Sequence, residues 1–394
     1  MHIVHYFPAM VEEDGGVVRA ILDGVTALAD AGQSVTLLTH DALDCPPEWK
    51  EADSNENGPR VVQLGSLLPG SKRMRAADLR TLSRHLQDSD VVHLHTPWVP
   101  SNHQVGGLCQ RMATPYVITL HGMLDDWCIE QKRWKKKLYL ALGGRRLLEE
   151  AAFVHCTAQE EQRQSSQHAP GARWKVVPCL VDLPAYANLP GPELAREHFP
   201  ELASVGINLL FLSRLHVKKG IERLLEAVAS LRNSNPNLKL WIAGPGEEDY
   251  VAMLKNKAQE LGLQDCSNFL GMVRGDLKLS LYEAADLFVL PTSQENFGLV
   301  SVEAMLCGTP VLTTYGVDIW EDLQNGGATI VENTSKAVAK GIADLVADPE
   351  ELATRGQQGR QHVHDWLAPD HVTGQMVEMY EEAVGRALAA GASQ

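Results

Sequence analysis

One stretch decides the fold: Asp286-Leu-Phe-Val-Leu290-Pro-Thr-Ser-Gln-Glu295-Asn-Phe-Gly298-Leu-Val-Ser-Val-Glu303-Ala304. Its apolar first five residues predict a short strand that Pro291 ends, and Leu299–Leu306 predicts a helix that stops at Cys307-Gly308. The helix begins at Gly298. Its first N–H groups have no partner inside the helix and favour an anion there, above all a phosphate.

Two glutamates flank this helix start, Glu295 in the loop and Glu303 on the helix. A carboxylate repels a phosphate, so we expect both to accept hydrogen bonds from neutral hydroxyls. A phosphate joined to a polyol, as in a sugar nucleotide, satisfies both features. Chance spacing is the alternative, because the chain has 50 acidic residues and most acidic side chains are solvated.

A second strand and turn lie upstream, in Phe211-Leu-Ser-Arg214-Leu-His-Val-Lys-Lys219-Gly220. Arg214 offers a planar guanidinium and Lys219 a compact point charge, a pair that suits a diphosphate. The helical repeat of Ile221, Leu224, Leu225 and Val228 predicts a buried helix behind the turn. That helix would hold the two cations at the carboxyl end of the strand, although a solvated loop is the alternative.

With these motifs the chain resembles the retaining GT-B glycosyltransferases, specifically the GT4 kind, the group 1 glycosyl transferases. The resemblance covers nearly the whole chain. Its marks are the Glu295/Glu303 pair, the turn from Arg214 to Gly220, Ala243-Gly244-Pro-Gly246, Asn268-Phe-Leu-Gly271, the Gly15-Gly16 pair and Thr119-Leu-His121-Gly122. Ser213 departs from the glycine that the family more often has, and serine is small enough to keep the phosphate site.

The resemblance implies roles for individual residues. His121 would contact the 6-position of the donor sugar, with its carbonyl near the anomeric carbon, and Glu295 would position the sugar. Together with Arg214 and Lys219, these two make the expected catalytic set. The expected donor-binding set is Gly15, Gly16, Gly244, Gly271, Met272, Val273, Asn296, Phe297, Gly298, Leu299 and Glu303. Glu303 would hold the ribose, while backbone near Gly271 would contact the base.

The implied reaction is transfer of a hexose from a UDP- or GDP-linked donor to a glycan, a lipid-linked or another hydroxyl acceptor, with retention of configuration. It would serve synthesis of cell-surface polysaccharide or glycolipid. No cofactor is expected, and cations on the leaving group make a metal redundant. The alternatives are a GT-B sugar-nucleotide epimerase and a non-catalytic sugar-nucleotide-binding protein. A dehydrogenase is disfavoured, since no G-x-G-x-x-G follows the first strand.

The 394 residues alternate β-rich and helical runs twice over, which predicts two doubly wound α/β domains. A linker rich in proline and glycine, residues 182–192, separates them. We expect Rossmann-like domains over residues 1–185 and 190–368, facing each other across a cleft, with the acceptor on the first domain and the nucleotide sugar on the second. The resemblance implies that a last helix, about 371–390, crosses back to the first domain.

Composition is that of an ordinary soluble protein, with 44% apolar and 22% charged residues. A net charge of −15 disfavours a nucleic-acid partner. Neither a signal peptide nor a long apolar segment is evident, so we expect a cytoplasmic protein. Seven scattered cysteines without a C-x-x-C spacing predict free thiols.

Lys132-Arg-Trp-Lys-Lys-Lys137 places five cations around one tryptophan. A charge run is usually a solvated helix face. The alternative is peripheral contact with an anionic membrane on its inner face, because an indole among cations suits a lipid headgroup layer.

His93 and His95 alternate with Leu94 in a predicted strand. We expect their side chains to point to opposite faces of this strand and therefore not to bind one metal ion together. No metal site is expected elsewhere in the chain.

Overall fold

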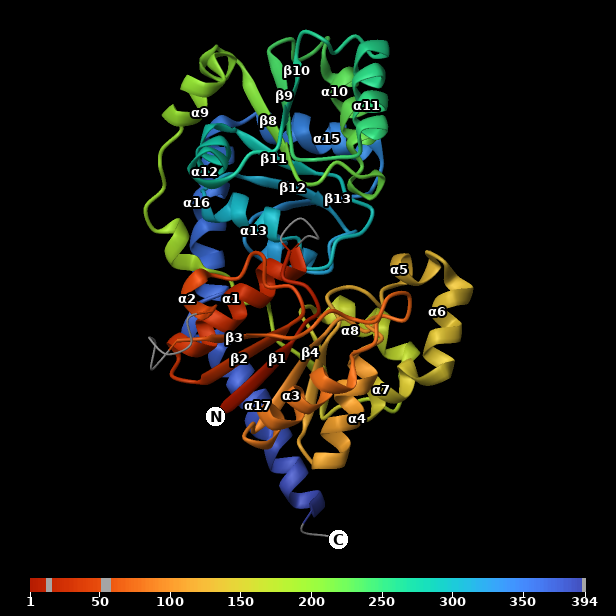
Figure 1. The fold of residues 1–394 in the computed structure, drawn as a ribbon. Helices are drawn as coiled ribbons and strands as arrows, with labels where there is room; N and C mark the ends of the chain where they lie inside the picture. The colour runs from red at the N-terminus through yellow and green to blue at the C-terminus, as the bar shows by residue number, and fades with distance from the viewer. Residues whose placement is uncertain (12–15, 51–57, 392–394) are drawn as a thin grey trace. The chain divides into compact units, whose positions relative to one another are not determined.

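The computed structural model describes residues 1–11, 16–50 and 58–391. The chain divides into two compact units (Figure 1). The first unit comprises Met1–Asp182 and Pro369–Gln394, and the second unit comprises Leu183–Ala368. The last helix thus belongs to the first unit although it follows the second in sequence.

The first unit is built on a seven-stranded parallel sheet with the order β3-β2-β1-β4-β5-β6-β7. Its strands are β1 (His2–Tyr6), β2 (Ser34–Thr39), β3 (Arg60–Gln63), β4 (Val91–His95), β5 (Tyr116–Thr119), β6 (Phe153–Cys156) and β7 (Trp174–Val176). The order reverses direction between β1 and β4, which is where ligands bind in sheets of this kind.

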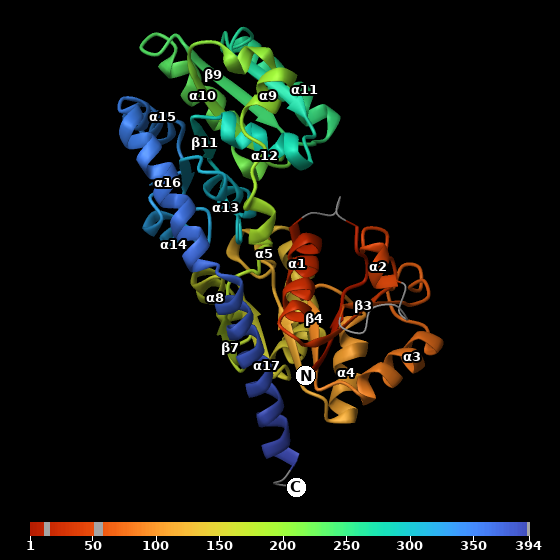
Figure 2. The same cartoon turned by 90° about the vertical axis from the view of Figure 1, so that its left-hand side faces the viewer.

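Helices cover both faces of this sheet (Figure 2). They are α1 (Gly16–Asp30), α2 (Pro47–Lys50), α3 (Ala76–Gln87), α4 (Asn102–Met112), α5 (Asp126–Glu130), α6 (Arg133–Tyr139), the π-helix η2 (Leu140–Gly144), α7 (Arg145–Glu149), α8 (Gln159–Ser165), the 3₁₀ turn η3 (Ser166–His168) and α17 (Pro369–Gly391). Helices α1 and α17 pack together, and α3 and α4 form a separate pair.

Alternation along the central strands gives the two faces of the first sheet different chemistry. Val4 and Tyr6 of β1 join the apolar core with residues of α3, α4 and α7. The residue between them, His5, points to the opposite face, toward α1. One face of the sheet therefore builds an apolar core, while the other carries polar groups near the carboxyl ends of its strands.

His93 and His95 lie on this same polar face, so the expectation of opposite faces is wrong. Strand side chains alternate with a period of two, and residues two apart therefore share a face. The two imidazole rings are stacked with centroids 4.4 Å apart.

The second unit has a six-stranded parallel sheet with the order β10-β9-β8-β11-β12-β13. Its strands are β8 (Ile207–Leu212), β9 (Leu238–Ala243), β10 (Ser267–Gly271), β11 (Leu287–Leu290), β12 (Val311–Thr314) and β13 (Thr329–Val331). The sequence did not reveal β13, a three-residue edge strand whose residues are all only partly buried. So short a run has no alternation to detect.

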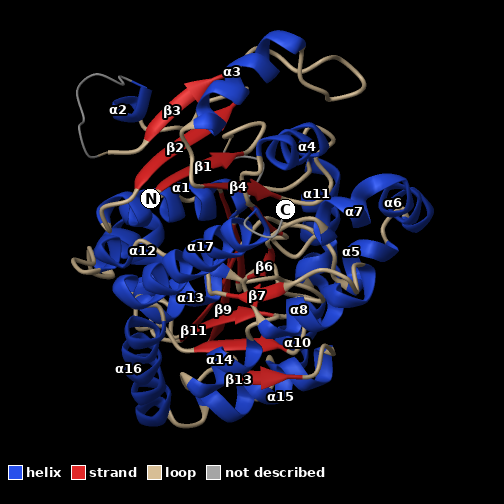
Figure 3. Cartoon of the chain, turned by 90° about the horizontal axis from the view of Figure 1, so that it is seen from below, coloured by secondary structure: helices blue, strands red, loops and turns tan. Residues whose placement is uncertain are grey.

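Helices surround the second sheet (Figure 3). They are η4 (Leu183–Tyr186), α9 (Glu193–His198), η5 (Pro200–Ala203), η6 (Val217–Lys219), α10 (Ile221–Leu231), α11 (Glu248–Glu260), α12 (Gly275–Ala284), α13 (Leu299–Leu306), α14 (Trp320–Asn325), α15 (Ser335–Val346) and α16 (Pro349–Trp366), of which η4, η5 and η6 are 3₁₀ turns. The buried helix expected behind Gly220 is α10.

Two doubly wound parallel sheets confirm the predicted fold class. Each unit repeats the strand order expected for a Rossmann-like domain. Among the helices of the described residues, none combines the length and the apolar character that a membrane-spanning segment requires. All seven cysteines are free thiols.

Candidate active site

Two loops of the second unit lie side by side because β8 and β11 are neighbours in the sheet. The turn after β8 leads to α10, and the loop after β11 leads to α13. The carbonyl of Lys218 joins them, accepting hydrogen bonds from the Ser293 N–H (2.7 Å) and the Thr292 hydroxyl (3.1 Å). The two motifs that the sequence singled out therefore form one connected surface.

Two glycines allow the backbone to pack this closely. A Cβ on Gly220, whose φ is +72°, would lie 2.0 Å from the Pro291 carbonyl oxygen. A Cβ on Gly244, whose φ is +133°, would lie 1.9 Å from the Ser213 carbonyl oxygen. Both distances are far below contact, so each position needs glycine for space as well as for conformation. Gly244, expected to bind the donor, therefore also has a packing function.

Arg214 and Lys219 occupy different surroundings in this turn. Arg214 is exposed, whereas Lys219 is only 5% exposed and its Nζ forms an ion pair with Glu295 Oε2. Burial lowers the pKa of Lys219, and the charges of Lys218 and Arg214 lower it further. Cations that destabilise one another in this way make a site that an added anion would stabilise.

The loop before α13 holds the other expected contacts. Gly298, at φ +65°, precedes the first helical residue, Leu299, and no side chain caps this end of α13. The Asn296 amide donates to Asp318 Oδ2 at 3.4 Å. Phe297 is buried, and its ring stacks on Trp366 with centroids 5.6 Å apart. Its side chain therefore anchors the loop, and only its backbone remains available to a ligand.

Glu303 is held by two side chains of α12. Its Oε1 accepts from Lys278 Nζ at 2.9 Å, and its Oε2 accepts from the Tyr282 hydroxyl at 3.1 Å. These contacts fix the carboxylate. Sequence reasoning missed both partners; Lys278 and Tyr282 are four residues apart on α12 and so share one side of it.

Gly271, the last residue of β10, and the following Met272 and Val273 lie where the base was expected to bind. Gly271 has a left-handed φ of +71° and pairs with Ala243 of β9 after a register irregularity in β10. The Gly271 carbonyl accepts from the Gly244 N–H at 2.7 Å. Met272 is exposed and Val273 is buried.

In the first unit, β5 ends at Thr119, and Leu120 and His121 follow it. His121 and Gly122 both have left-handed backbones, with φ values of +53° and +71°. Such a conformation is strained for histidine and is found mainly where the surroundings impose it. Glu161, a fully buried carboxylate on α8, accepts from the Gly122 N–H at 2.5 Å and from the Thr157 N–H at 2.6 Å. Glu161 thus stabilises the strained turn.

Gly16, the other expected contact in this unit, is the exposed first residue of α1. Its partner in the predicted pair, Gly15, lies outside the described residues.

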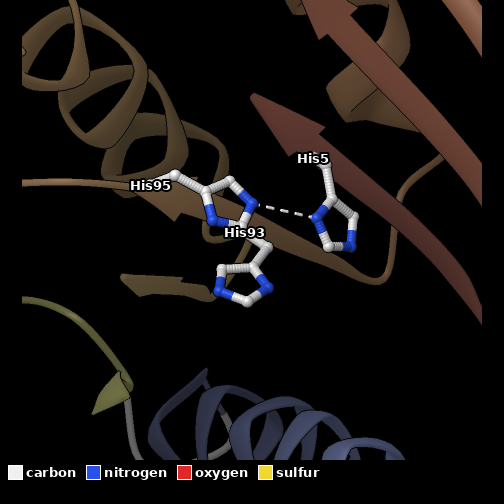
Figure 4. A group of neighbouring side chains, drawn as sticks. All are labelled: His5, His93 and His95. Carbon is white, nitrogen blue, oxygen red and sulfur yellow. Dashed lines mark hydrogen bonds between the residues drawn. The ribbon is translucent and has the colours of Figure 1, made fainter. Parts of the chain in front are cut away.

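Five histidines of the first unit gather near the carboxyl ends of β1, β4, β5 and β6: His5, His93, His95, His121 and His155. His5, His93 and His95 offer ligand atoms within 4.8 Å of one another and are buried (Figure 4). Imidazoles so arranged are candidate metal ligands. Hydrogen bonds already occupy them, however. His5 Nδ1 pairs with His95 Nε2, and His95 Nδ1 with His121 Nε2, each at 3.1 Å.

A second chain of hydrogen bonds runs through His93. Its Nδ1 lies 2.7 Å from the Tyr380 hydroxyl and its Nε2 lies 2.5 Å from Thr119 Oγ1. Thr119 Oγ1 also lies 2.7 Å from His155 Nδ1, and His155 Nε2 lies 2.8 Å from the carbonyl of Val177. Both ring nitrogens of His93 and of His95 are therefore engaged.

Burial keeps the cluster neutral. It lowers the pKa of His5 to about 3 and that of His155 to about 4. The pKa values of His93, His95 and His121 are also lowered, first by burial and then by neighbouring imidazoles. The five rings are thus uncharged hydrogen-bonding groups at neutral pH.

Family models match both units. Residues 15–179 match the model described as glycosyl transferase 4-like domain, and residues 199–362 match the one described as glycosyl transferases group 1. The chain belongs to this glycosyltransferase family. The resemblance expected from its motifs is confirmed.

Individual proteins are similar to this chain over nearly its full length. D-inositol 3-phosphate glycosyltransferase of Thermobispora bispora is 27% identical over 94% of this chain and 91% of its own. Sucrose-phosphate synthase from Thermosynechococcus elongatus has a TM-score of 0.78 at 21% identity, over 98% of this chain and 99% of its own. Anabaena HepE, solved in complex with UDP, has a TM-score of 0.77 at 21% identity, over 97% and 100%. Both solved structures therefore have the same fold as this chain.

Sequence reasoning missed His5, His155 and Glu161 around His121. His5 and His155 each lie one residue before the end of a strand, β1 and β6, and in a parallel sheet the carboxyl ends of the strands meet at one edge. Comparing the polar residues near the carboxyl ends of the strands would have grouped these histidines. Glu161 carried no signal, because a buried carboxylate on a helix looks like a solvated one.

The neutral histidines make this glycosyltransferase sensitive to acid. Their folded pKa values lie below the unfolded value of about 6.5, so stability is complete above pH 6.5 and is lost as the pH falls toward 4. We expect each buried histidine to remove about 1.4 kcal/mol of unfolding free energy between pH 7.5 and 5.5. Urea unfolding of the first unit at both pH values, monitored by its tryptophans, measures the loss.

Replacing buried His155 with Gln should reduce this pH dependence by about the share of one histidine. The control, His371→Gln, changes an exposed histidine and should leave it unaltered. Equal slopes for His155→Gln and the parent would contradict the assignment.

Proposed function

We propose that this glycosyltransferase transfers a hexose from a UDP- or GDP-linked donor to a hydroxyl acceptor with retention of the anomeric configuration. The acceptor would be a glycan or a lipid-linked sugar in the synthesis of cell-surface polysaccharide or glycolipid. The observation that carries the proposal is the contact of Lys219 with Glu295, beside exposed Arg214 and the uncapped start of α13. These groups combine a site for an anion with a carboxylate, Glu295, that can accept hydrogen bonds from sugar hydroxyls.

The second unit would hold the nucleotide. Arg214, Lys219 and the N–H groups that follow Gly298 would bind the diphosphate and stabilise the charge that develops on it. Glu303, held by Lys278 and Tyr282, would accept from the ribose hydroxyls. Backbone from Gly271 to Val273 would contact the base.

Reaction would follow a front-face path. The bond from the anomeric carbon to the diphosphate oxygen breaks, and the acceptor oxygen bonds to the same face of that carbon. The acceptor proton passes to the departing diphosphate. Glu295 would position the sugar through its ring hydroxyls, and His121 is assigned the contact with the 6-position that the resemblance implies. The proposal involves no metal ion, since cationic side chains neutralise the leaving group.

The relatives support a nucleotide-sugar donor and leave several acceptors open. Anabaena HepE was solved with UDP-glucose, whereas the relative from T. bispora is named for inositol 3-phosphate. A UDP-linked hexose is therefore the first donor to test. The proposal of a lipid-linked acceptor rests on a different feature, the exposed helix α6.

We further propose that the enzyme is cytoplasmic and that α6 contacts an anionic membrane at its inner face. None of the residues of α6 is buried. Trp134 is 67% exposed, Leu138 50% and Leu142, in η2, 79%. Their spacing of four places them along one side of the helical segment, among the cations of Lys132–Lys137. Charge complementarity and this apolar row favour lipid headgroups over a protein partner.

The diphosphate assignment predicts a large effect at Arg214. Arg214→Ala should lower the rate of donor hydrolysis or transfer by about 10²–10³-fold, because charge on the leaving group loses a cation. Arg214 is exposed, so the melting temperature should not change. Lys219→Ala should lose as much rate and some stability, since Glu295 would keep a carboxylate without its partner. Steady-state kinetics and thermal unfolding measure both effects.

The adjacent Lys218→Ala is the matched control and should retain most of the rate. Parent-like rates in Arg214→Ala and Lys219→Ala would refute the diphosphate site.

Retention and independence from metal can be tested together. Incubation with labelled UDP-glucose and, separately, with GDP-mannose in EDTA should give slow donor hydrolysis and, with an acceptor, a product of unchanged anomeric configuration. Proton NMR of the anomeric coupling reads the outcome. An inverted product or loss of activity in EDTA would reject the mechanism. Formation of an epimer, or binding without turnover, would indicate the two alternative functions.

Membrane contact should depend on α6. The parent should co-sediment with anionic vesicles at low salt, and a Trp134→Ser, Lys135→Ser, Lys137→Ser variant should bind at least about 30-fold less, since each of the two lost cations contributes about 1 kcal/mol. Lys136 is excluded because it donates to the Cys128 carbonyl at 2.5 Å. Lys336→Ser, Lys340→Ser in the second unit is the control. No co-sedimentation of the parent would mean that α6 is a solvated face.

A further inference from the structure

The histidine cluster of the first unit contains two hydrogen-bonded chains that differ in one respect. One chain ends on a carbonyl group, which can only accept a hydrogen bond, and the other chain has no such group at its end. This difference determines where the protons lie, and it bears on His121.

The direction of the first chain is fixed by the carbonyl of Val177. A carbonyl can only accept, so His155 must carry its proton on Nε2. Because His155 is neutral, its Nδ1 is a lone pair and accepts from the Thr119 hydroxyl. The oxygen of Thr119 then accepts from His93 Nε2, and His93 Nδ1 accepts from the Tyr380 hydroxyl. Each proton in this chain has a single position.

The second chain, His5–His95–His121, has no such anchor among the described residues. Its inner end, His5 Nε2, is buried without a hydrogen-bond partner. One proton lies in each of the two links, between His5 Nδ1 and His95 Nε2 and between His95 Nδ1 and His121 Nε2. With all three rings neutral, two arrangements satisfy both links. Either all three rings carry the proton on Nδ1, or all three carry it on Nε2.

We propose that His95 is a positioning residue for His121, which fixes the ring of His121 and couples its tautomer to those of His95 and His5. The other ring nitrogen of His121, Nδ1, is then a donor in one arrangement and an acceptor in the other, and it changes only when the protons of all three rings shift. Glu161 fixes the backbone of the same residue through Gly122. The effect of this coupling on catalysis rests on the proposed function, in which His121 contacts the donor sugar.

A metal ion held by His5, His93 and His95 is the competing interpretation. It would require lone pairs that point to one centre. His93 uses its only lone pair to accept from Tyr380, and His95 uses its own within the chain. The rings of His93 and His95 are also stacked, with only 25° between their planes, so their lone pairs do not converge from opposite sides. The hydrogen-bonded arrangement therefore accounts for these contacts better.

Tautomers can be read directly on the full-length chain labelled with ¹⁵N-histidine. Long-range ¹H–¹⁵N spectra at pH 7.5 distinguish an Nδ1 proton from an Nε2 proton, and single variants assign the signals. We expect His93 and His155 to be protonated on Nε2, and His5, His95 and His121 to share one tautomer. Unlike tautomers among these three, or an imidazolium, would overturn the proposal. Activity is not needed for this measurement, so it stands even if the proposed function fails.

Two amide variants test the positioning of His121. Asparagine places its amide where Nδ1 of histidine lies, whereas glutamine places it where Nε2 lies. His95→Asn should therefore keep the link to His121 and lose the link to His5, and His95→Gln should do the reverse. Both put an amide in the same buried site, which makes their stabilities comparable.

We expect His95→Gln to lower kcat for donor hydrolysis by about 10²-fold with little change in KM, because a misplaced contact group costs about that much. His95→Asn should stay within about threefold of the parent. Equal losses in the two variants would reduce His95 to a structural role and reject the proposal. One Zn²⁺ bound per chain by the parent, and lost in both His93→Gln and His95→Asn, would establish the metal site instead.

Discussion

The close packing of two backbones in the second unit is the constraint on which the candidate donor site depends. The turn after β8 meets the loop after β11 so closely that a Cβ at Gly220 would lie 2.0 Å from the Pro291 carbonyl. This packing aligns the Lys218 carbonyl with Ser293 and brings Lys219 to Glu295. The cation and the carboxylate are 76 residues apart in sequence, and only the adjacency of β8 and β11 unites them.

The same adjacency explains why the fold and much of the site could be predicted. Parallel strands collect their carboxyl ends at one edge, so motifs that follow predicted strands must lie near one another. The bounds of α13 and β11 agree with the sequence pattern to within one residue, because β11 ends just before Pro291 and α13 ends just before Cys307-Gly308. The partners of individual side chains were harder to predict from the sequence. Nothing in the sequence linked Glu303 to Lys278, or Gly122 to Glu161, because such contacts depend on how helices pack against a sheet.

The error at His93 and His95 had a different cause. The alternation was recognised, but its period was applied wrongly, and this hid the histidine cluster. With the correct period, His93 and His95 share a face, and His5 on the neighbouring strand pairs with His93 in the register of the sheet. A strand pattern that places histidine where valine is usual therefore carried more information than we extracted from it.

Neutral imidazoles solve a specific physical problem beneath a strained turn. A carboxylate or an ammonium group in one of these buried positions would need an oppositely charged partner. Without a partner, the desolvation of its charge would destabilise the fold. Histidine both donates and accepts while remaining uncharged, so five rings can fill one buried face with hydrogen bonds. Glu161, a buried carboxylate behind this turn, accepts hydrogen bonds from the N–H groups of Gly122 and Thr157. Polar groups in a core usually reduce stability, and their concentration next to His121 fits the rule that such departures gather at functional sites.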